Sequence, residues 1–223
     1  MDNSMKPASK HGIQPPRLPK PLAVGASATL TDRTEVSHAL LADQDFTNLQ
    51  AANLLFEQVH IRNVAFTQTR LSKARLFDTR IERCDFSGAN WEGARFRRVE
   101  FLGCRLLGMN LIEAGFEDVF FKDCNAEGAV LISATFKAAR FEKCIFREAS
   151  FESADLTGAV FQDCDLTRAD LRGAKLAGAD LRGSVIDGVQ IGIKELLGAV
   201  IDPMQAIQVV SLFGIHIREI GES

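Results

Sequence analysis

The sequence predicts an all-β fold, a solid four-sided rod of short extended segments, and three observations predict it. First, a large apolar residue returns at every fifth position from about Asp45 to Ile191, interrupted only by Ala51 and Ala126. Second, the position two residues before it is small. Third, all five cysteines are spaced 20 residues apart. Helices repeat every 3.6 residues and strands every two, so a period of five indicates an internal repeat.

The two periodic positions are expected to point inward. Of the 16 Phe, all but Phe77, Phe120 and Phe213 lie on the large position. The small position holds Ala, Cys, Val, Thr or Ser from Val59 onward, with Met109 as the exception. Each pentapeptide would therefore supply one short side of the rod and one corner.

The corners have their own residue preference. Ten of the 17 Gly lie two residues after the large position, and Asn48, Asn53 and Asn63 occupy the same place. This place is the third residue of a turn, where type II geometry needs a positive φ. Gly adopts that conformation without steric cost and Asn tolerates it, so the sequence predicts a turn after each side.

The cysteine spacing indicates four sides per coil. If 20 residues close one coil, the sulfurs stack in a ladder with a spacing of about 4.8 Å. Buried, reduced thiols are then expected instead of a disulfide framework. A ladder of metal sites is the alternative, disfavoured because zinc needs tetrahedral convergence and not a straight row. The ladder consists of Cys84, Cys104, Cys124, Cys144 and Cys164.

The repeat resembles a known family. Ala154-Asp155-Leu156, Ala169-Asp170-Leu171 and Ala179-Asp180-Leu181 show the A(D/N)LXX pattern of pentapeptide-repeat proteins. The resemblance covers about 150 of the 223 residues. It implies a right-handed quadrilateral parallel β-helix.

The chain divides into three parts. Residues 1–33 are rich in Pro and lack a hydrophobic period, so we expect a flexible tail, either a tether for a partner or an extension without one. Residues 34–193 are expected to form about eight coils. The first coil is expected to be irregular, because Leu54 occupies a small position and Ala51 a large one; the register is expected from Phe56.

Residues 194–223 are expected to form a C-terminal cap. Asp202 suits a helix N-cap, Pro203 the first turn and Gly214 the position after the end, which predicts a short helix near residues 203–213. Residues 215–217 are expected to form a last strand. The candidate cap and dimer residues are Met204, Ile207, Val210, Leu212 and Phe213.

Residues 197–202 and 212–215 resemble the C-terminal segment of the quinolone-resistance branch of the family. That resemblance implies a cap that makes a head-to-head dimer, and a plain cap is the alternative. The same branch implies DNA gyrase as a partner, bound by an acidic rod that mimics DNA.

Composition excludes several function classes. The net charge is −3, and no run of 18 apolar residues could span a membrane. Residues 1–22 lack a signal-peptide core, so a cytoplasmic protein is expected. No phosphate-binding loop, nucleophile elbow or HExxH motif occurs, and the four His are scattered. We therefore expect no catalytic, cofactor-binding or metal-binding residues, no small-molecule substrate, and no enzyme.

The balance of acidic and basic residues argues against extensive mimicry of DNA. Residues 45–191 contain 21 acidic and 19 basic residues, and the signs alternate between positions 20 residues apart. Residues 111–191 are more acidic, with 14 acidic and 9 basic residues, so a partial mimic would use that half. Direct nucleic-acid binding is disfavoured, since outward aromatic residues are nearly absent from the Arg-rich first coils.

The competing hypothesis is an interaction scaffold for a partner unrelated to topoisomerases. Large apolar residues occupy several outward positions, and an apolar patch on a charged rod favours a protein partner. The candidate patch consists of Leu107, Ile112, Phe120, Val130 and Ile132.

Overall fold

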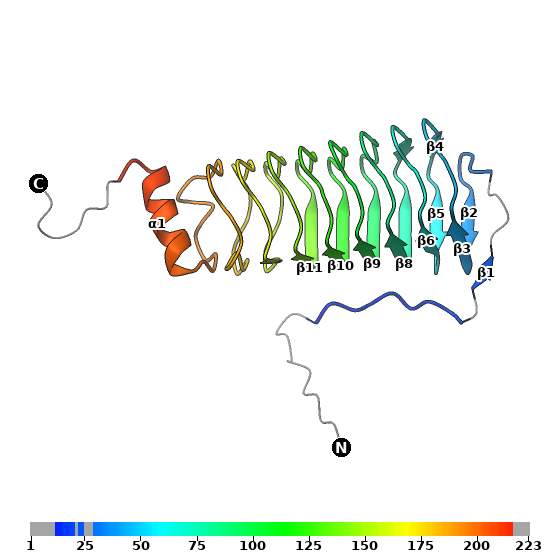
Figure 1. Cartoon of the computed structure of the whole chain (residues 1–223), viewed down its shortest axis with the longest axis horizontal. Helices are drawn as coiled ribbons and strands as arrows, with labels where there is room; N and C mark the ends of the chain where they lie inside the picture. The colour runs from blue at the N-terminus through cyan, green and yellow to red at the C-terminus, as the bar shows by residue number, and fades with distance from the viewer. Residues whose placement is uncertain (1–11, 21, 25–28, 216–223) are drawn as a thin grey trace, which may run out of the picture.

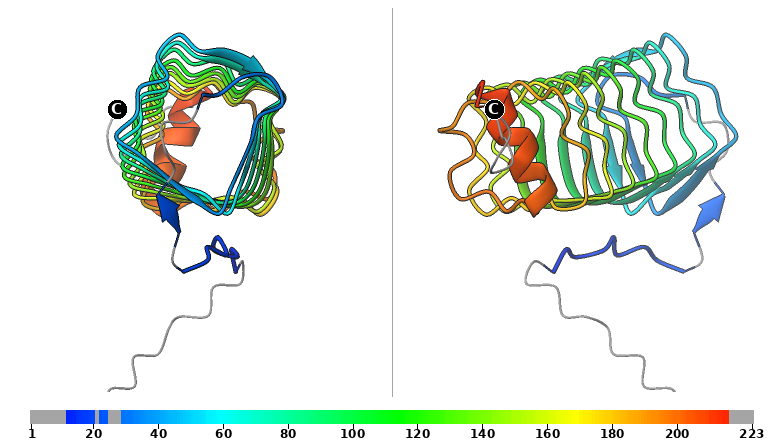
Figure 2. Two further views of the ribbon diagram at one scale, coloured as in Figure 1. Left: turned by 90° about the vertical axis from the view of Figure 1, so that its right-hand side faces the viewer. Right: turned by 60° about the vertical axis from the view of Figure 1, so that its left-hand side comes forward.

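The computed structural model describes residues 12–20, 22–24 and 29–215. The chain forms a long rod with a helix at its C-terminal end, and residues 12–20 run along the outside (Figure 1). Viewed nearly along its axis, the rod has a four-sided outline, with the helix across the far end (Figure 2).

The regular elements are short strands and one helix. In chain order they are β1 (Ala23–Val24), β2 (Glu35–Ser37), β3 (Ala39–Ala42), β4 (Gln50–Ala52), β5 (Leu55–Glu57), β6 (His60–Arg62), β7 (Arg70–Ser72), β8 (Arg75–Glu82), β9 (Arg95–Leu102), β10 (Gly115–Lys122), β11 (Thr135–Glu142), β12 (Val160–Gln162) and α1 (Pro203–Leu212).

The strands stack in parallel with an offset of 20 residues. Phe96 lies opposite Phe116, which lies opposite Phe136, along β9, β10 and β11. Single bridges continue the offset where no strand is formed, in the column Asp45, Ala65, Asp85, Arg105, Asn125, Ile145, Asp165 and Val185. Four pentapeptides therefore close one coil, and the predicted quadrilateral β-solenoid is confirmed.

The corners are more uniform than the sequence suggested. Every residue whose number ends in 3 or 8, from Arg33 to Gly188, has a φ between 49° and 75°. Most are neither Gly nor Asn, although a left-handed conformation costs an L-residue about 1–2 kcal/mol. The corner N–H is bonded to the next coil, as from Asn48 to the Thr67 carbonyl at 3.0 Å, and this bond helps to hold the strained residue.

The interior is filled by the two inward positions. The Phe101 and Phe121 rings stack at 4.4 Å between centroids, and Phe116 and Phe136 at 4.5 Å. The Trp91 indole N–H donates to the Thr69 hydroxyl at 3.0 Å. Side chains from neighbouring coils thus interdigitate along the whole rod, as the periodicity predicted.

The cysteines form the predicted ladder. All five are free and buried. Each Cys carbonyl accepts a hydrogen bond from the residue 21 positions later, which stacks the five in successive coils. The Cys144 neighbour and burial together raise the pKa of Cys164 above its ordinary value. Ser184 takes the next place in the row and accepts from the Cys164 N–H at 3.0 Å.

The N-terminal part differs from expectation. The first coil is regular: Asn53 is an ordinary corner with a φ of 58°, and Ala51 and Leu54 are both buried. Residues 12–20 contact the rod, so this part of the expected tail is not free. β1 pairs with β3 and Leu30 joins the core, while residues 1–11, 21 and 25–28 of the expected tail lie outside the described residues.

The C-terminal helix lies where it was expected. Asp202 is its N-cap and accepts from the Met204 and Gln205 N–H groups, and Pro203 is in the first turn. Ile215 is not in a strand, and the other residues of the predicted last strand lie outside the described part. Within the described ranges, no helix is long and apolar enough to span a bilayer.

Candidate interaction surfaces

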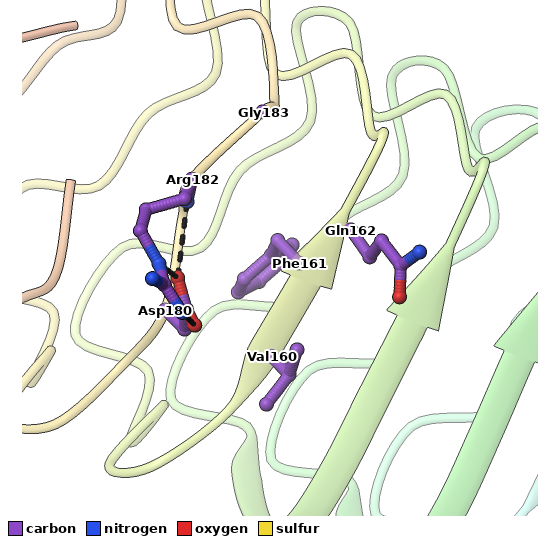
Figure 3. A pocket seen from close by; sticks show the side chains of 6 residues that line it. All are labelled: Val160, Phe161, Gln162, Asp180, Arg182 and Gly183. Atoms are coloured by element: carbon purple, nitrogen blue, oxygen red, sulfur yellow. Dashed lines mark hydrogen bonds and ion pairs between the residues drawn. The ribbon is translucent and has the colours of Figure 1, made fainter. Parts of the chain in front are cut away.

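Hollows occur on the surface of the rod, and each is defined by its lining residues. One of about 380 Å³ is lined by Val160, Phe161, Gln162, Asp180, Arg182 and Gly183 (Figure 3). Its carboxylate is already engaged, because the Arg182 guanidinium donates to both oxygens of Asp180, at 2.9 and 2.7 Å. The Arg182 hydrogen bonds lower the pKa of Asp180, so this group stays ionised and is poorly suited to act as a general acid.

A second hollow, of about 410 Å³, lies over β8 to β11. Gly115 is part of its lining, and the Arg95 side chain packs against this glycine so closely that an added Cβ would lie 2.8 Å from it. Arg97 lies 5.5 Å from the centre of the Phe77 ring. Arg97 thus covers one face of this aromatic ring, and Lys137 in the same lining is paired with Glu117. Across the described part of the chain, no cluster of three or more His, Cys, Asp or Glu could hold a metal ion.

The predicted apolar patch is brought together only in part. Ile112, Val130 and Ile132 flank the buried Leu111 and Leu131 on one wall, in neighbouring coils. Leu107 lies on the preceding wall and Phe120 on β10, across the rod. All five patch residues are half-buried. The structure thus places three of them together as a modest apolar strip.

The largest exposed apolar surface lies at the C-terminal end. Among the described residues, all exposed large apolar side chains fall between positions 185 and 215: Val185, Ile193, Leu197, Val200, Met204, Ile207, Leu212 and Ile215. Met204, Leu197 and Ile193 are 71%, 69% and 64% exposed. The sequence prediction included Met204, Ile207 and Leu212 but missed Ile193 and Leu197. The signal was available, because apolar residues beyond the end of the five-residue frame have no inward place.

Polar contacts fix the inner face of α1. Gln205 is buried and donates through its side-chain amide to the carbonyls of Leu181 and Ser184, at 2.6 and 2.7 Å. Asp202 accepts from the Gly183 N–H at 3.0 Å. Val209 packs against the core. These contacts satisfy some of the backbone N–H and carbonyl groups of the last coil, which has no further coil to pair with.

The outer face of α1 is uncharged and mainly apolar, with Gln208 and Ser211 as its exposed polar residues. Met204, Ile207 and Leu212 are exposed, while the predicted Val210 and Phe213 are half-buried. Residues 203–215 contain no charged residue. An apolar helix face directed away from its own domain is a typical contact surface.

Ion pairs between coils neutralise much of the rod. Arg80 pairs with Glu100 at 2.8 Å, Lys122 with Glu142 at 2.7 Å, and Lys137 with Glu117 at 3.2 Å. The alternation of signs predicted from the sequence therefore produces actual pairs. The carboxylates of the C-terminal half that form no ion pair within the described residues are Glu113, Asp118, Asp123, Glu127, Glu152, Asp163 and Asp187.

A protein-family model matches part of the repeat. Residues 94–171 match the model of a pentapeptide repeat region. No curated protein matches the chain.

Several solved structures are similar. A trypsin-treated variant of QnrB1, a plasmid-mediated fluoroquinolone resistance protein, is 20% identical over 84% of this chain and 99% of its own, with a TM-score of 0.45. HetL, a pentapeptide repeat protein involved in heterocyst differentiation regulation in the cyanobacterium Nostoc sp. strain PCC 7120, is 19% identical over 77% and 87%, with a TM-score of 0.30. Rfr23 from the cyanobacterium Cyanothece 51142 is 14% identical over 77% and 90%, with a TM-score of 0.15.

Proposed function

We propose that this pentapeptide-repeat solenoid acts without catalysis, by holding a rigid surface against a protein partner. The observation that carries the proposal is the gathering of exposed apolar side chains at the C-terminal end of an otherwise charged and self-neutralised rod. The interior of each coil is occupied by packed side chains, so binding must take place on the outside. The expected cytoplasmic location is part of this proposal.

The first partner we propose is a second copy of the chain, joined end to end through α1. A symmetric contact places each residue near its own counterpart or close neighbours, so a charged surface would repel itself there. The outer face of α1 avoids this cost, since residues 203–215 carry no charge. Leu197 and Ile193 would extend the apolar contact beyond the helix.

Light scattering during gel filtration tests the dimer. The full chain is expected at twice its single-chain mass of 24.4 kDa. Met204→Glu and Ile207→Glu each place a charge in the contact and should give the single-chain mass. Thr135→Glu, an exposed substitution in the middle of the rod, is the control and should leave the dimer intact. A single-chain mass for the unmodified protein at tens of micromolar would refute the dimer.

DNA gyrase is the second candidate partner. The excess of acidic residues after position 111 supports it, together with the resemblance of the C-terminal segment to the quinolone-resistance branch. An end-to-end dimer would put the two more acidic halves at the centre of a longer rod. The unpaired carboxylates would be the groups that meet the positively charged surface of the enzyme, because paired ones offer little net charge.

A supercoiling assay with purified gyrase, with and without a fluoroquinolone, tests this partner. The full chain should alter supercoiling or protect it from the drug at micromolar concentration. Glu152→Gln combined with Asp163→Asn should weaken the effect, and Glu82→Gln, on the basic half, should not. No effect of the full chain would remove gyrase and leave the scaffold for another protein.

A further inference from the structure

The N-terminal segment of residues 12–20 is seated along one corner of the rod (Figure 1). The Arg17 N–H donates to an Asp78 carboxylate oxygen at 3.0 Å, and the Arg17 carbonyl accepts from the Gln58 side-chain amide at 2.9 Å. Further along the rod, the Gln14 N–H donates to an Asp118 oxygen at 3.3 Å. Ile13, Pro16, Leu18 and Pro19 are half-buried. Backbone groups of the segment therefore form hydrogen bonds with residues that lie 41 to 104 positions later in the chain.

The receiving surface is a row of corner residues, Gln58, Asp78, Arg98 and Asp118, which we name the corner row. They occupy the same place in four successive coils and share φ values of 49° to 54°. Asp78 is only 6% exposed and accepts from the Arg98 guanidinium, whose Nε lies 2.6 Å from Oδ1. A buried, oriented carboxylate of this kind is a fixed acceptor for an incoming N–H.

The spacing of the row suits an extended proline-rich chain. A polyproline II helix has three residues per turn and rises about 3.1 Å per residue, so N–H groups three residues apart share a side at a separation of about 9.3 Å. Asp78 and Asp118 are two coils apart, a separation of about 9.6 Å. Gln14 and Arg17, the two residues that donate, are three residues apart. The residues between them, Pro15 and Pro16, have no N–H that would need an acceptor.

We propose that the corner row is a binding site for extended proline-rich peptides, filled here by residues 12–20 and available to a proline-rich segment of another protein when they leave. The site lies away from the C-terminal end, so it stands apart from the proposed dimer. The bound peptide needs two free N–H groups three residues apart with prolines between them. None of residues 12–20 belongs to the hydrophobic core, so their departure leaves the rod packed.

Trypsin digestion of the full chain tests whether residues 12–20 are bound to the corner row. Cleavage after Arg17 requires the segment to leave the corner row, so its rate follows the fraction of open molecules. Gln58→Ala removes one hydrogen bond and should speed this cleavage by about threefold to tenfold. Gln68→Ala is the matched control, since Gln68 is also a corner residue, with a φ of 57°, and makes no hydrogen bond to the segment. Equal cleavage rates in the unmodified chain and both variants would show that residues 12–20 are not bound to the corner row.

Fluorescence anisotropy with a labelled peptide of residues 12–20 tests binding from outside. A variant lacking residues 1–20 should bind this peptide at least tenfold more tightly than the full chain, whose own segment competes at an effective concentration of about a millimolar. Asp118→Asn in the shortened variant should weaken binding, as should Pro16→Ala in the peptide. Thermal melting of the shortened variant checks that the rod is intact. An intact rod that shows no binding at millimolar peptide, or equal binding by both chains, would overturn the proposal.

Discussion

Two adjacent phenylalanines on β10 provide a matched test of the packing. Phe121 is 4% exposed, and its ring stacks on Phe101 at 4.4 Å and on Phe141 at 5.3 Å. Phe120 is the preceding residue, faces outward and is half-buried. Phe121→Ala removes a buried ring and leaves a cavity, which costs about 3–5 kcal/mol, with about 0.5–1.5 kcal/mol more for each stacked pair.

Such a loss is a large fraction of the stability of an ordinary domain, about 5–15 kcal/mol. Phe120→Ala removes a partly exposed ring and should cost about 1 kcal/mol. Urea unfolding, followed by circular dichroism, measures the free energy of unfolding of both variants. Phe121→Asp should abolish cooperative unfolding, since a buried unpaired charge costs more still. Equal losses for Phe120→Ala and Phe121→Ala would refute the inward assignment of the large position.

Three further predictions concern the cap, the thiols and pH. Gln205→Ala leaves the buried Ser184 carbonyl without its partner and removes one of the two hydrogen bonds to the Leu181 carbonyl, so it should cost about 1–3 kcal/mol in the same assay, whereas the exposed Gln208→Ala should cost little. The five cysteines should react with a thiol reagent only after denaturant is added, and fast labelling of the folded chain would contradict their burial. Burial raises the pKa of Asp78, but hydrogen bonds from Arg98 and the Arg17 N–H outweigh it and place the pKa below its ordinary 3.8. This stabilisation is complete above the unfolded pKa and is lost as pH falls through the lower folded one, so Asp78→Asn should flatten the loss of stability that occurs as pH falls below 3.8.

The sequence predicts this fold well because one short period specifies both the buried positions and the corners. It identifies corner positions by Gly and Asn but not the range of residues found there. Lys73 and Arg83, for example, adopt φ values of 56° and 50°. Bonds to the next coil stabilise most corners, and such contacts are absent from any local pattern. Local preference therefore indicates where the chain turns, while stacking determines which residues are tolerated there.

The first coil shows how packing can satisfy a sequence that breaks its own pattern. Leu54 occupies a small position and Ala51 a large one, yet both are buried and the register is unbroken. Exchanging a large and a small residue conserves the volume inside the coil, which cores tolerate well. Considered position by position, the first coil breaks the residue pattern twice. Considered by its total interior volume, the same coil is predicted to be regular.

The candidate surfaces were harder to predict, because they depend on residues far apart in the chain. The contact of Gln14 with Asp118 spans 104 positions and uses a backbone N–H, so no pattern of side chains in the sequence predicts it. The helix α1 was predicted from its capping residues. Which of its faces is exposed depends on Gln205, whose side chain is directed to the carbonyls of Leu181 and Ser184.

Stacking also determines which charged groups of the rod remain without an ion pair. Like charges in neighbouring coils repel, so a regular rod alternates its signs and neutralises itself. Arg75 and Arg95 depart from this rule, since they lie opposite each other on β8 and β9. Arg95 directs its guanidinium to the carbonyls of Gly93, Ala94 and Glu113, and Arg75 forms no ion pair within the described residues. The same reasoning applies to the cap: no further coil lies beyond α1, so its exposed side chains have no stacked neighbour and are available to a partner.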